Sequence, residues 1–242
     1  MTELRWLSPN EAPDSFPSPG DALTEPNGLL AVGGDLSPQR LLAAYPKGIF
    51  PWYEEGQPIL WWSPDPRAVL IPADLHVSRR LSRTLRQSRL RLSADTAFGA
   101  VVEGCAAPRR YAIGTWITPA MHEAYERLHR LGWAHSFEAW NGGDLVAGMY
   151  GVAVGRVFFG ESMFARISDA SKIVFVSAVE YLQARQFELI DCQVWSDHLK
   201  SLGATTLPRT AFLGLLQQLC EPPGEPFCWS KDYARYVGAE DL

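Results

Sequence analysis

Cysteine is scarce in this chain, and the four cysteines that it has are far apart. They are Cys105, Cys192, Cys220 and Cys228, with no C-x-x-C pair among them. Zinc knuckles and disulfide frameworks both need regularly or closely spaced cysteines. The sequence therefore predicts neither a zinc site nor a disulfide-stabilised secreted domain, and a cytoplasmic setting is expected.

Long apolar runs are also lacking. No stretch approaches the roughly 18 to 20 uninterrupted apolar residues that a transmembrane helix needs. The first residues, MTELR, do not combine a basic start with an apolar segment, which is unlike a secretory signal. We therefore expect no membrane partner.

Motifs for metals and nucleotide cofactors are missing as well. The five histidines, His76, His122, His129, His135 and His198, do not have the spacing of HExxH or a similar ligand set. The sequence contains no GxSxG elbow, no Walker loop and no GxGxxG. We expect no metal site and no cofactor.

Apolar and aromatic side chains are abundant: 47% of the 242 residues are hydrophobic and 12% are aromatic. This composition supports a sizeable core and excludes a disordered chain. Residues 1–30 and 49–67 are rich in proline, glycine or aromatic residues, which predicts loops. Beyond them the pattern is mixed. We predict a small N-terminal domain, residues 1–66, and a mixed α/β domain, residues 67–242.

Caps and apolar spacing mark the expected elements. A serine or threonine followed by proline, as at Ser37 and Thr118, is typical of a helix start. Helices are predicted over 38–45, 77–87, 95–106, 119–131, 169–185 and 209–219. Strands are predicted over 134–140 and 188–194, and the runs 144–150 and 152–159 predict a hairpin or meander joined through glycine turns.

Positive charge is concentrated in one segment of an otherwise acidic protein. The net charge is -5, yet residues 76–91 contain six arginines and no acid. Such a segment suits a polyanion, and arginine favours forked contacts with phosphate. The alternative is a solvated amphipathic helix with Leu81 and Leu85 facing inward. The candidates for nucleic-acid contact are Arg79, Arg80, Arg83 and Arg86.

The strand around Asp191 carries a carboxylate and an amide two residues apart. Because side chains alternate along a strand, Asp191 and Gln193 are expected to share one face and to join in one hydrogen-bonded chain. In the alternative, Asp191 caps a helix near Ser196 and Gln193 is solvated. His198, just beyond, fits either an acid–base role or a helix cap together with Asp197.

Glu161 follows a predicted strand, and by itself this position favours an exposed residue. Several apolar residues near these polar candidates fit either a binding pocket or an ordinary core, since helical or alternating spacing usually marks core. They are Met149, Met163, Phe175, Leu182 and Ile190.

Seven short blocks stand out in order along the chain. They are NGLLAVGGDL (27–36), GIFPW (48–52), WWSPDPR (61–67), GTWIT (114–118), GMYGV (148–152), GESMF (160–164) and IDCQ (190–193). Together they resemble the bacterial leucyl/phenylalanyl-tRNA–protein transferases. The resemblance runs from about residue 16 to residue 210, which is most of the chain.

The resemblance implies a C-terminal domain with an acetyltransferase-like (GNAT-like) acyltransferase fold. It implies that Trp52 and Trp116 hold the terminal adenosine of the tRNA. It implies that Asp191 and Gln193 assist peptide-bond formation, with Glu161 a polar residue of the same site. The residues that match the family's amino-acid pocket are Met149, Met163, Phe175, Leu182 and Ile190.

The resemblance also implies the reaction and its partners. The family transfers Leu or Phe, and also Met, from aminoacyl-tRNA to the N-terminal Arg or Lys of a protein and so marks it for degradation. No DNA partner is implied. The cationic first side chain of the acceptor needs an acid, for which Glu161 or Asp191 is the candidate.

An acyl-CoA-dependent N-acetyltransferase of the same fold is the alternative. Such enzymes hold pyrophosphate on a Q/R-x-x-G-x-G/A loop ahead of the long helix. Residues 164–172 read FARISDASK and lack those glycines, which favours an RNA-borne donor.

Overall fold

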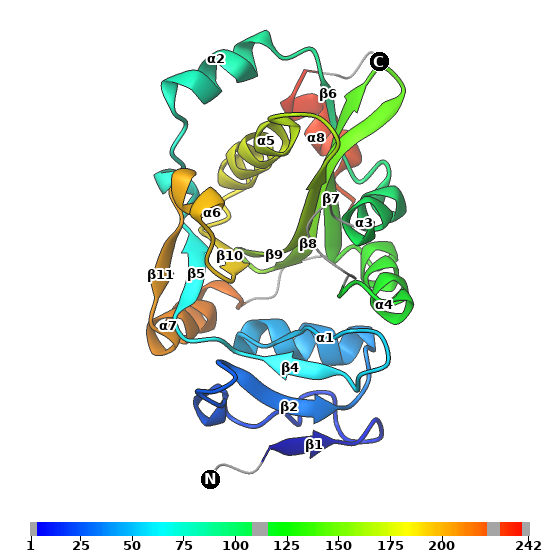
Figure 1. Cartoon of the computed structure of the whole chain (residues 1–242), viewed down its shortest axis with the longest axis vertical. Helices are drawn as coiled ribbons and strands as arrows, with labels where there is room; N and C mark the ends of the chain where they lie inside the picture. The colour runs from blue at the N-terminus through cyan, green and yellow to red at the C-terminus, as the bar shows by residue number, and fades with distance from the viewer. Residues whose placement is uncertain (1–3, 108–115, 222–227, 239–242) are drawn as a thin grey trace.

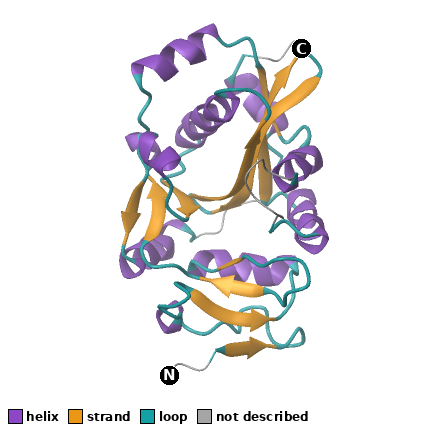
Figure 2. Ribbon diagram, viewed as in Figure 1, coloured by secondary structure: helices purple, strands orange, loops and turns teal. Residues whose placement is uncertain are grey.

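The computed structural model describes residues 4–107, 116–221 and 228–238. Its strands form two separate sheets, and helices cover both faces of the larger one (Figures 1 and 2). The predicted mixed α/β class is confirmed. Within the described part of the chain, no helix combines the length and the apolarity that a bilayer crossing requires.

The smaller sheet lies at the N-terminal end of the molecule and has the order β1-β2-β4-β3 (Figure 1). β1 runs parallel to β2, and the other pairs are antiparallel. The strands are β1 (Arg5–Leu7), β2 (Leu29–Gly33), β3 (Phe50–Pro51) and β4 (Leu60–Trp62). The prediction that residues 1–30 and 49–67 are loops is therefore wrong in part, because strands of two to five residues are too short to show alternation.

The larger sheet has seven strands in the order β11-β5-β10-β9-β8-β7-β6. Only β9 and β10 run parallel among these neighbours. The strands are β5 (Arg67–Leu70), β6 (Arg91–Ala94), β7 (Ala134–Asn141), β8 (Asp144–Val154), β9 (Val157–Ala165), β10 (Leu189–Gln193) and β11 (Thr205–Leu207).

Helices pack on both faces of this sheet. On one face, α3 and α4 contact β7, β8 or β9, and on the other face α5 contacts the same three strands (Figure 1). Ten of the 15 residues of α5 are buried, as expected for a helix that is apolar on most sides. The helices are α1 (Pro38–Ala44), α2 (Arg79–Gln87), α3 (Phe98–Ala106), α4 (Pro119–Arg130), α5 (Ala170–Ala184), α6 (Asp197–Ser201), α7 (Arg209–Leu219) and α8 (Ser230–Tyr236).

Local signals located most helices within a few residues. The hydroxyl groups of Ser37 and Thr118 accept backbone N–H groups at the starts of α1 and α4, as predicted. The predicted break near Gly151 is wrong: β8 continues to Val154, and the turn comes at Gly155, where φ is +59°. Gly151 instead lies at a register shift within the β8–β9 pair.

The proposed division at residue 66 falls between the two sheets, but the hydrophobic core continues across it. One cluster of buried side chains includes Leu30 and Trp61 from the small sheet together with Tyr150 and Phe212 from the rest of the chain. The tyrosine at the end of α1, Tyr45, belongs to the same cluster. This continuity allows the N-terminal segment to contribute side chains to a site on the larger sheet.

Candidate active site

A cavity of about 290 Å³ opens where β8, β9, β10 and α5 meet. This volume is close to the lower end of small-molecule sites, roughly 300–1,000 Å³. Met149 and Met163 lie opposite each other in the β8–β9 pair and form part of the apolar wall. Phe175, Ile190 and Trp116 complete it. The structure thus brings together four of the five apolar pocket candidates and one of the two tryptophans.

Leu182 is the pocket candidate that lies elsewhere. It follows Phe175 by seven residues, about two turns of α5. Its side chain is fully buried in the core cluster and does not line the cavity. The alternative interpretation, that Leu182 is an ordinary core residue, therefore agrees with the structure.

Trp52 lies outside the cavity wall, in the loop after β3. Its side chain is 43% exposed, and its ring centroid is 5.7 Å from that of Trp62. The hydroxyl groups of Tyr53 and Thr118 are 3.3 Å apart, which places this loop next to the segment that carries Trp116. Gly114 and Thr115 of the GTWIT block lie outside the described residues.

Glu161 is buried, contrary to what its sequence position favours; only 9% of it is exposed. It accepts hydrogen bonds from the Tyr125 hydroxyl (2.6 Å), the Tyr45 hydroxyl (2.9 Å) and Nε2 of Gln193 (3.1 Å). Burial raises the pKa of Glu161 to about 7, against the lowering effect of the two tyrosines, and the nearby Asp191 charge adds to the rise. The site therefore holds a carboxyl group that titrates near neutral pH.

Tyr45 and Tyr125 are site residues that the sequence did not indicate. Tyr45 directly follows α1 and Tyr125 lies in α4, and no local pattern links either of them to Glu161. Burial raises the pKa of each well above the usual tyrosine value. Both hydroxyls therefore stay protonated and can donate to the carboxylate. Tyr150 adds a third buried hydroxyl, which has no hydrogen-bond partner among the described residues.

Asp191 has no exposed surface, and its carboxylate forms a two-point ion pair with Arg67. The Arg67 Nε atom lies 2.8 Å from Oδ1, and Nη2 lies 2.6 Å from Oδ2. Oδ1 also accepts the backbone N–H of Gln193 at 2.9 Å. Arg67 ends the WWSPDPR block, but its sequence position gave no sign of this partner.

The connection between Asp191 and Gln193 differs from the expected one. The pairing of β10 with β5 shifts register between these residues, and Gln193 adopts φ = +60°. Simple alternation therefore fails at this bulge. Asp191 bonds the Gln193 main chain, and the Gln193 side chain bonds Glu161. The helix cap near this point is Ser196, which accepts the Leu199 N–H.

These bonds also bear on acceptor recognition. Asp191 is paired with Arg67, and Glu161 receives three donors from the protein. The hypothesis that either carboxylate receives the cationic side chain of an acceptor is therefore disfavoured. His198 lines the cavity, and burial, followed by the charge of Lys172, lowers its pKa.

The arginine-rich segment forms α2, as predicted, and no residue of α2 lines the first cavity. Figure 1 shows α2 apart from the strands β8, β9 and β10. Leu81 is buried and Leu85 is half-buried, so both face the protein. The four predicted arginines are all exposed. They are Arg79, Arg80, Arg83 and Arg86.

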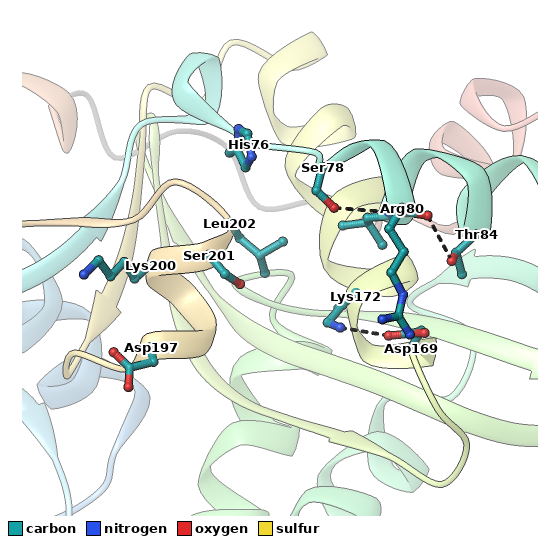
Figure 3. A pocket seen from close by; sticks show the side chains of 11 residues that line it. His76, Ser78, Arg80, Thr84, Asp169, Lys172, Asp197, Lys200, Ser201 and Leu202 are labelled. Atoms are coloured by element: carbon teal, nitrogen blue, oxygen red, sulfur yellow. Dashed lines mark hydrogen bonds and ion pairs between the residues drawn. The ribbon is translucent and has the colours of Figure 1, made fainter.

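A second cavity, of about 570 Å³, lies between α2, the start of α5, and α6. Figure 3 shows the guanidinium group of Arg80 directed toward Asp169, which also accepts a 2.8 Å hydrogen bond from Lys172. Lys200 lines the cavity from α6. The opposite side of α6 supplies His198 to the first cavity, so this short helix separates the two.

Metal-binding groups do not gather in the described part of the chain: no three side chains of His, Cys, Asp or Glu are placed to hold an ion there. The side chains in and beside the first cavity offer carboxyl, amide, hydroxyl, imidazole and thiol groups. Such groups can bind, orient and exchange protons with an amine or an ester.

Family models cover most of the chain. The model described as leucyl/phenylalanyl-tRNA protein transferase matches residues 69–217, and that of its N-terminal domain matches residues 34–65. The chain therefore belongs to the leucyl/phenylalanyl-tRNA protein transferase family, and the resemblance seen in the sequence blocks is confirmed.

Curated relatives are similar over nearly their whole length. A leucyl/phenylalanyl-tRNA--protein transferase of Stutzerimonas stutzeri is 56% identical over 220 residues, covering 91% of this chain and 96% of the relative. The protein of the same name from Methylococcus capsulatus is 54% identical over 226 residues, covering 93% and 96%.

Solved structures align more distantly. A GCN5-related N-acetyltransferase from Kribbella flavida aligns with TM-score 0.36 and 13% identity, covering 71% of this chain and 61% of that one. L-PGS from Bacillus licheniformis aligns with TM-score 0.37 and 9% identity, covering 68% and 55%. Both scores are low, so the family assignment depends on the sequence relatives.

Proposed function

We propose that this chain transfers leucine or phenylalanine, and also methionine, from aminoacyl-tRNA to the N-terminal Arg or Lys of a protein. The observation that carries the proposal is an apolar cavity lined by the buried Glu161, to which the half-buried Gln193 is hydrogen-bonded. The name shared by the relatives supports a charged-tRNA donor and a protein acceptor.

The cavity wall suits large apolar side chains that are not branched at Cβ, including the aromatic ring of Phe. Methionine is flexible and polarizable, so Met149 and Met163 can adapt to Leu, Phe and Met alike. Burial of such a side chain contributes about 1.5–3 kcal/mol. A polar side chain would lose its hydration there without gaining a partner.

The reaction exchanges an ester for an amide. The acceptor nitrogen attacks the ester carbonyl, the C–N bond forms, and the C–O bond to the tRNA ribose breaks. A protein α-amine has a pKa near 7.7–8.0, so roughly a quarter of it is neutral at cytoplasmic pH. The nitrogen must lose one proton as the bond forms, and the ribose oxygen must gain one. The donor is already activated, so the transfer consumes no further co-substrate.

Glu161 is the residue best suited to take that proton. Its pKa of about 7 is close to working pH, where proton exchange is most effective. Nε2 of Gln193 donates to Glu161, which leaves the amide oxygen to accept an N–H of the incoming amine. Holding ester and amine together supplies most of the acceleration.

The aromatic residues at the mouth of the site suit the terminal adenosine. Trp116 lines the cavity, and the loop that carries Trp52 lies next to it through the Tyr53–Thr118 contact. Stacking a base on an aromatic ring is worth roughly 1–3 kcal/mol and does not depend on the body of the tRNA.

The exposed arginines of α2 and the second cavity suit the phosphate groups of the tRNA chain that leads to the terminal adenosine. Arg80, Lys172 and Lys200 outnumber the acids Asp169 and Asp197 in this cavity, and no lining residue is Phe, Tyr or Trp. Phosphate contacts of this kind position a nucleic acid without selecting its sequence. The short helix α6 links this cavity to the catalytic one.

The setting follows from the substrates. Charged tRNA is a cytoplasmic species, and we propose that the enzyme acts there. Its product is a protein with a new N-terminal Leu, Phe or Met, and the family resemblance implies that this residue marks the protein for degradation.

A donor comparison tests the proposal. The purified protein is incubated with a peptide that begins with Arg and either labelled Leu-tRNA or acetyl-CoA. We expect a mass gain of one leucine with the tRNA donor and no acetylation. A matched peptide that begins with Asp is the acceptor control. Acetylation without leucine transfer would contradict the proposal and favour the N-acetyltransferase alternative.

A further inference from the structure

Arg67 is held by three separate parts of the chain. Besides its two bonds to Asp191, its Nη1 donates to the carbonyl oxygen of Gly48 at 3.2 Å. Its guanidinium carbon lies 4.6 Å from the ring centroid of Phe50 and 4.9 Å from that of Phe212. The side chain is 1% exposed. These contacts fix the orientation of the Arg67 guanidinium group, which is directed at β10.

Asp191 is fully engaged by this arrangement. Its two oxygens accept three hydrogen bonds, two from Arg67 and one from the backbone of Gln193. Asp191 belongs to β10, which pairs with β5, the strand that begins at Arg67; Figure 1 shows the two strands side by side. Although Asp191 borders the cavity, it has no exposed surface and Arg67 balances its charge. Glu161 keeps 9% of its surface exposed and accepts hydrogen bonds from neutral groups of the described residues, which makes it the better placed carboxylate to meet an amine.

The bond from Asp191 to Gln193 has a conformational consequence. Gln193 has φ = +60°, a left-handed conformation that non-glycine residues adopt only when their surroundings stabilise it. The hydrogen bond from its N–H to Asp191 supplies that stabilisation. With the backbone in this conformation, the Gln193 side chain reaches Oε1 of Glu161.

We propose that Arg67 is a positioning residue, which holds Gln193 in its reactive conformation through Asp191, and that Asp191 does not take the proton of the reaction. This inference rests on the proposed function and deepens it. It assigns Asp191 a structural part in the same hydrogen-bonded chain and leaves Glu161 and Gln193 as the groups that meet the substrates.

The chemistry of a buried ion pair provides the test. Removal of one partner leaves the other charge buried and unpaired, whereas removal of both charges relieves this problem. Asp191→Asn keeps an oxygen that can accept the Gln193 N–H. Arg67→Met keeps much of the side-chain volume. The double variant therefore retains the bond to Gln193 without either charge.

The experiment measures kcat and KM for Leu-tRNA in Arg67→Met, Asp191→Asn and the double variant. Each single change should lower kcat about 100-fold, because a misplacement of about 1 Å has an effect of that size. KM for the donor should change little, since neither residue belongs to the apolar wall. The double variant should recover to within about tenfold of the wild type, with an unchanged midpoint of its pH–rate profile.

A double variant that is no more active than Asp191→Asn alone would overturn the inference, because the charge of Asp191 would then be required. Circular dichroism and thermal unfolding identify variants that do not fold. If a variant does not fold, Arg67→Lys provides the test, because lysine keeps the buried positive charge but cannot make the two-point contact with Asp191. A wild-type kcat in Arg67→Lys would overturn the inference. A reduced kcat in a folded Arg67→Lys protein would support it. Failure of the wild-type protein to use Leu-tRNA would count against the proposed function instead.

Discussion

The Tyr125 hydroxyl donates a 2.6 Å hydrogen bond to Oε2 of Glu161, joining α4 to β9. Tyr45 makes the equivalent bond to Oε1 from the N-terminal part of the chain. These two donors favour the ionised carboxylate, while burial favours the protonated form. The balance leaves Glu161 with a pKa near 7, so small changes around it should be visible in solution.

The pH dependence of transfer should report Glu161. Because its carboxylate form accumulates as the pH rises through about 7, kcat/KM should rise over the same range. Glu161→Gln should lower kcat/KM by about 100- to 10,000-fold and leave only the titration of the acceptor amine. Glu180→Gln, the same change on the exposed side of α5, is the control. A Glu161→Gln profile identical to the wild-type profile would contradict this assignment.

Loss of a tyrosine hydroxyl should move that midpoint. The hydrogen bond from Tyr125 lowers the pKa of Glu161, so Tyr125→Phe should raise the pKa and shift the pH–rate profile to higher pH. Tyr233→Phe removes a buried hydroxyl that bonds Ser177 and should leave the midpoint in place. A shift to lower pH in Tyr125→Phe, or an equal shift in both variants, would refute the explanation.

Glu161 should also make stability depend on pH. Its pKa is about 7 in the folded protein and about 4.3 in an unfolded chain, so the folded state binds its proton more tightly. The resulting stabilisation is complete below about pH 4.3 and is lost as the pH rises through 7. Urea unfolding at several pH values should show that Glu161→Gln removes up to about 4 kcal/mol of this dependence. Parallel curves for the two proteins would contradict it.

Side chains of the cavity wall and of the core should behave differently. Met163→Ala enlarges the cavity, so the ratio of kcat/KM for Phe-tRNA to that for Leu-tRNA should rise. Leu182→Ala should lower the free energy of unfolding by about 2–5 kcal/mol and leave that ratio unchanged, because Leu182 does not line the cavity. A changed ratio in Leu182→Ala would contradict this account, because it would mean that Leu182 contributes to the pocket.

Charge reversal on α2 should weaken tRNA binding in a salt-dependent way. The variant Arg83→Glu with Arg86→Glu should raise KM for charged tRNA at least about tenfold and flatten its dependence on salt, since each lost phosphate contact lowers the slope by about one. Lys231→Glu on α8 is the matched control. If the double variant keeps the wild-type KM and salt slope, α2 is simply a solvated helix.

The sequence predicted local features well. The caps at Ser37 and Thr118 depend only on residues a few positions apart. The same is true of the spacing of leucine and arginine residues along α2. These signals located α1, α2 and α4, whereas the short helices α6 and α8 were not predicted. Gly151 was misleading because a strand can continue through a glycine where its partner strand shifts register, and that partner is invisible to local patterns.

The site depended on contacts that no local pattern encodes. Arg67 and Asp191 are 124 residues apart, and Tyr45 and Glu161 are 116 residues apart. Alternation along β10 predicted that Asp191 and Gln193 would act through one face, but the bulge gives them different partners. The resemblance to a family supplied the candidate residues, whereas only the packing of distant segments gave their connections.

The central claim is that the apolar cavity holds the amino-acid side chain of an esterified donor while the reacting carbonyl lies beside Gln193. A crystal structure with a non-hydrolysable phenylalanyl-adenosine analogue tests it most directly. The account predicts the phenyl ring between Met149 and Met163 and the carbonyl carbon within about 6 Å of the Gln193 amide oxygen, which leaves room for the attacking amine between them. A phenyl ring bound outside this cavity, with the cavity empty, would contradict it.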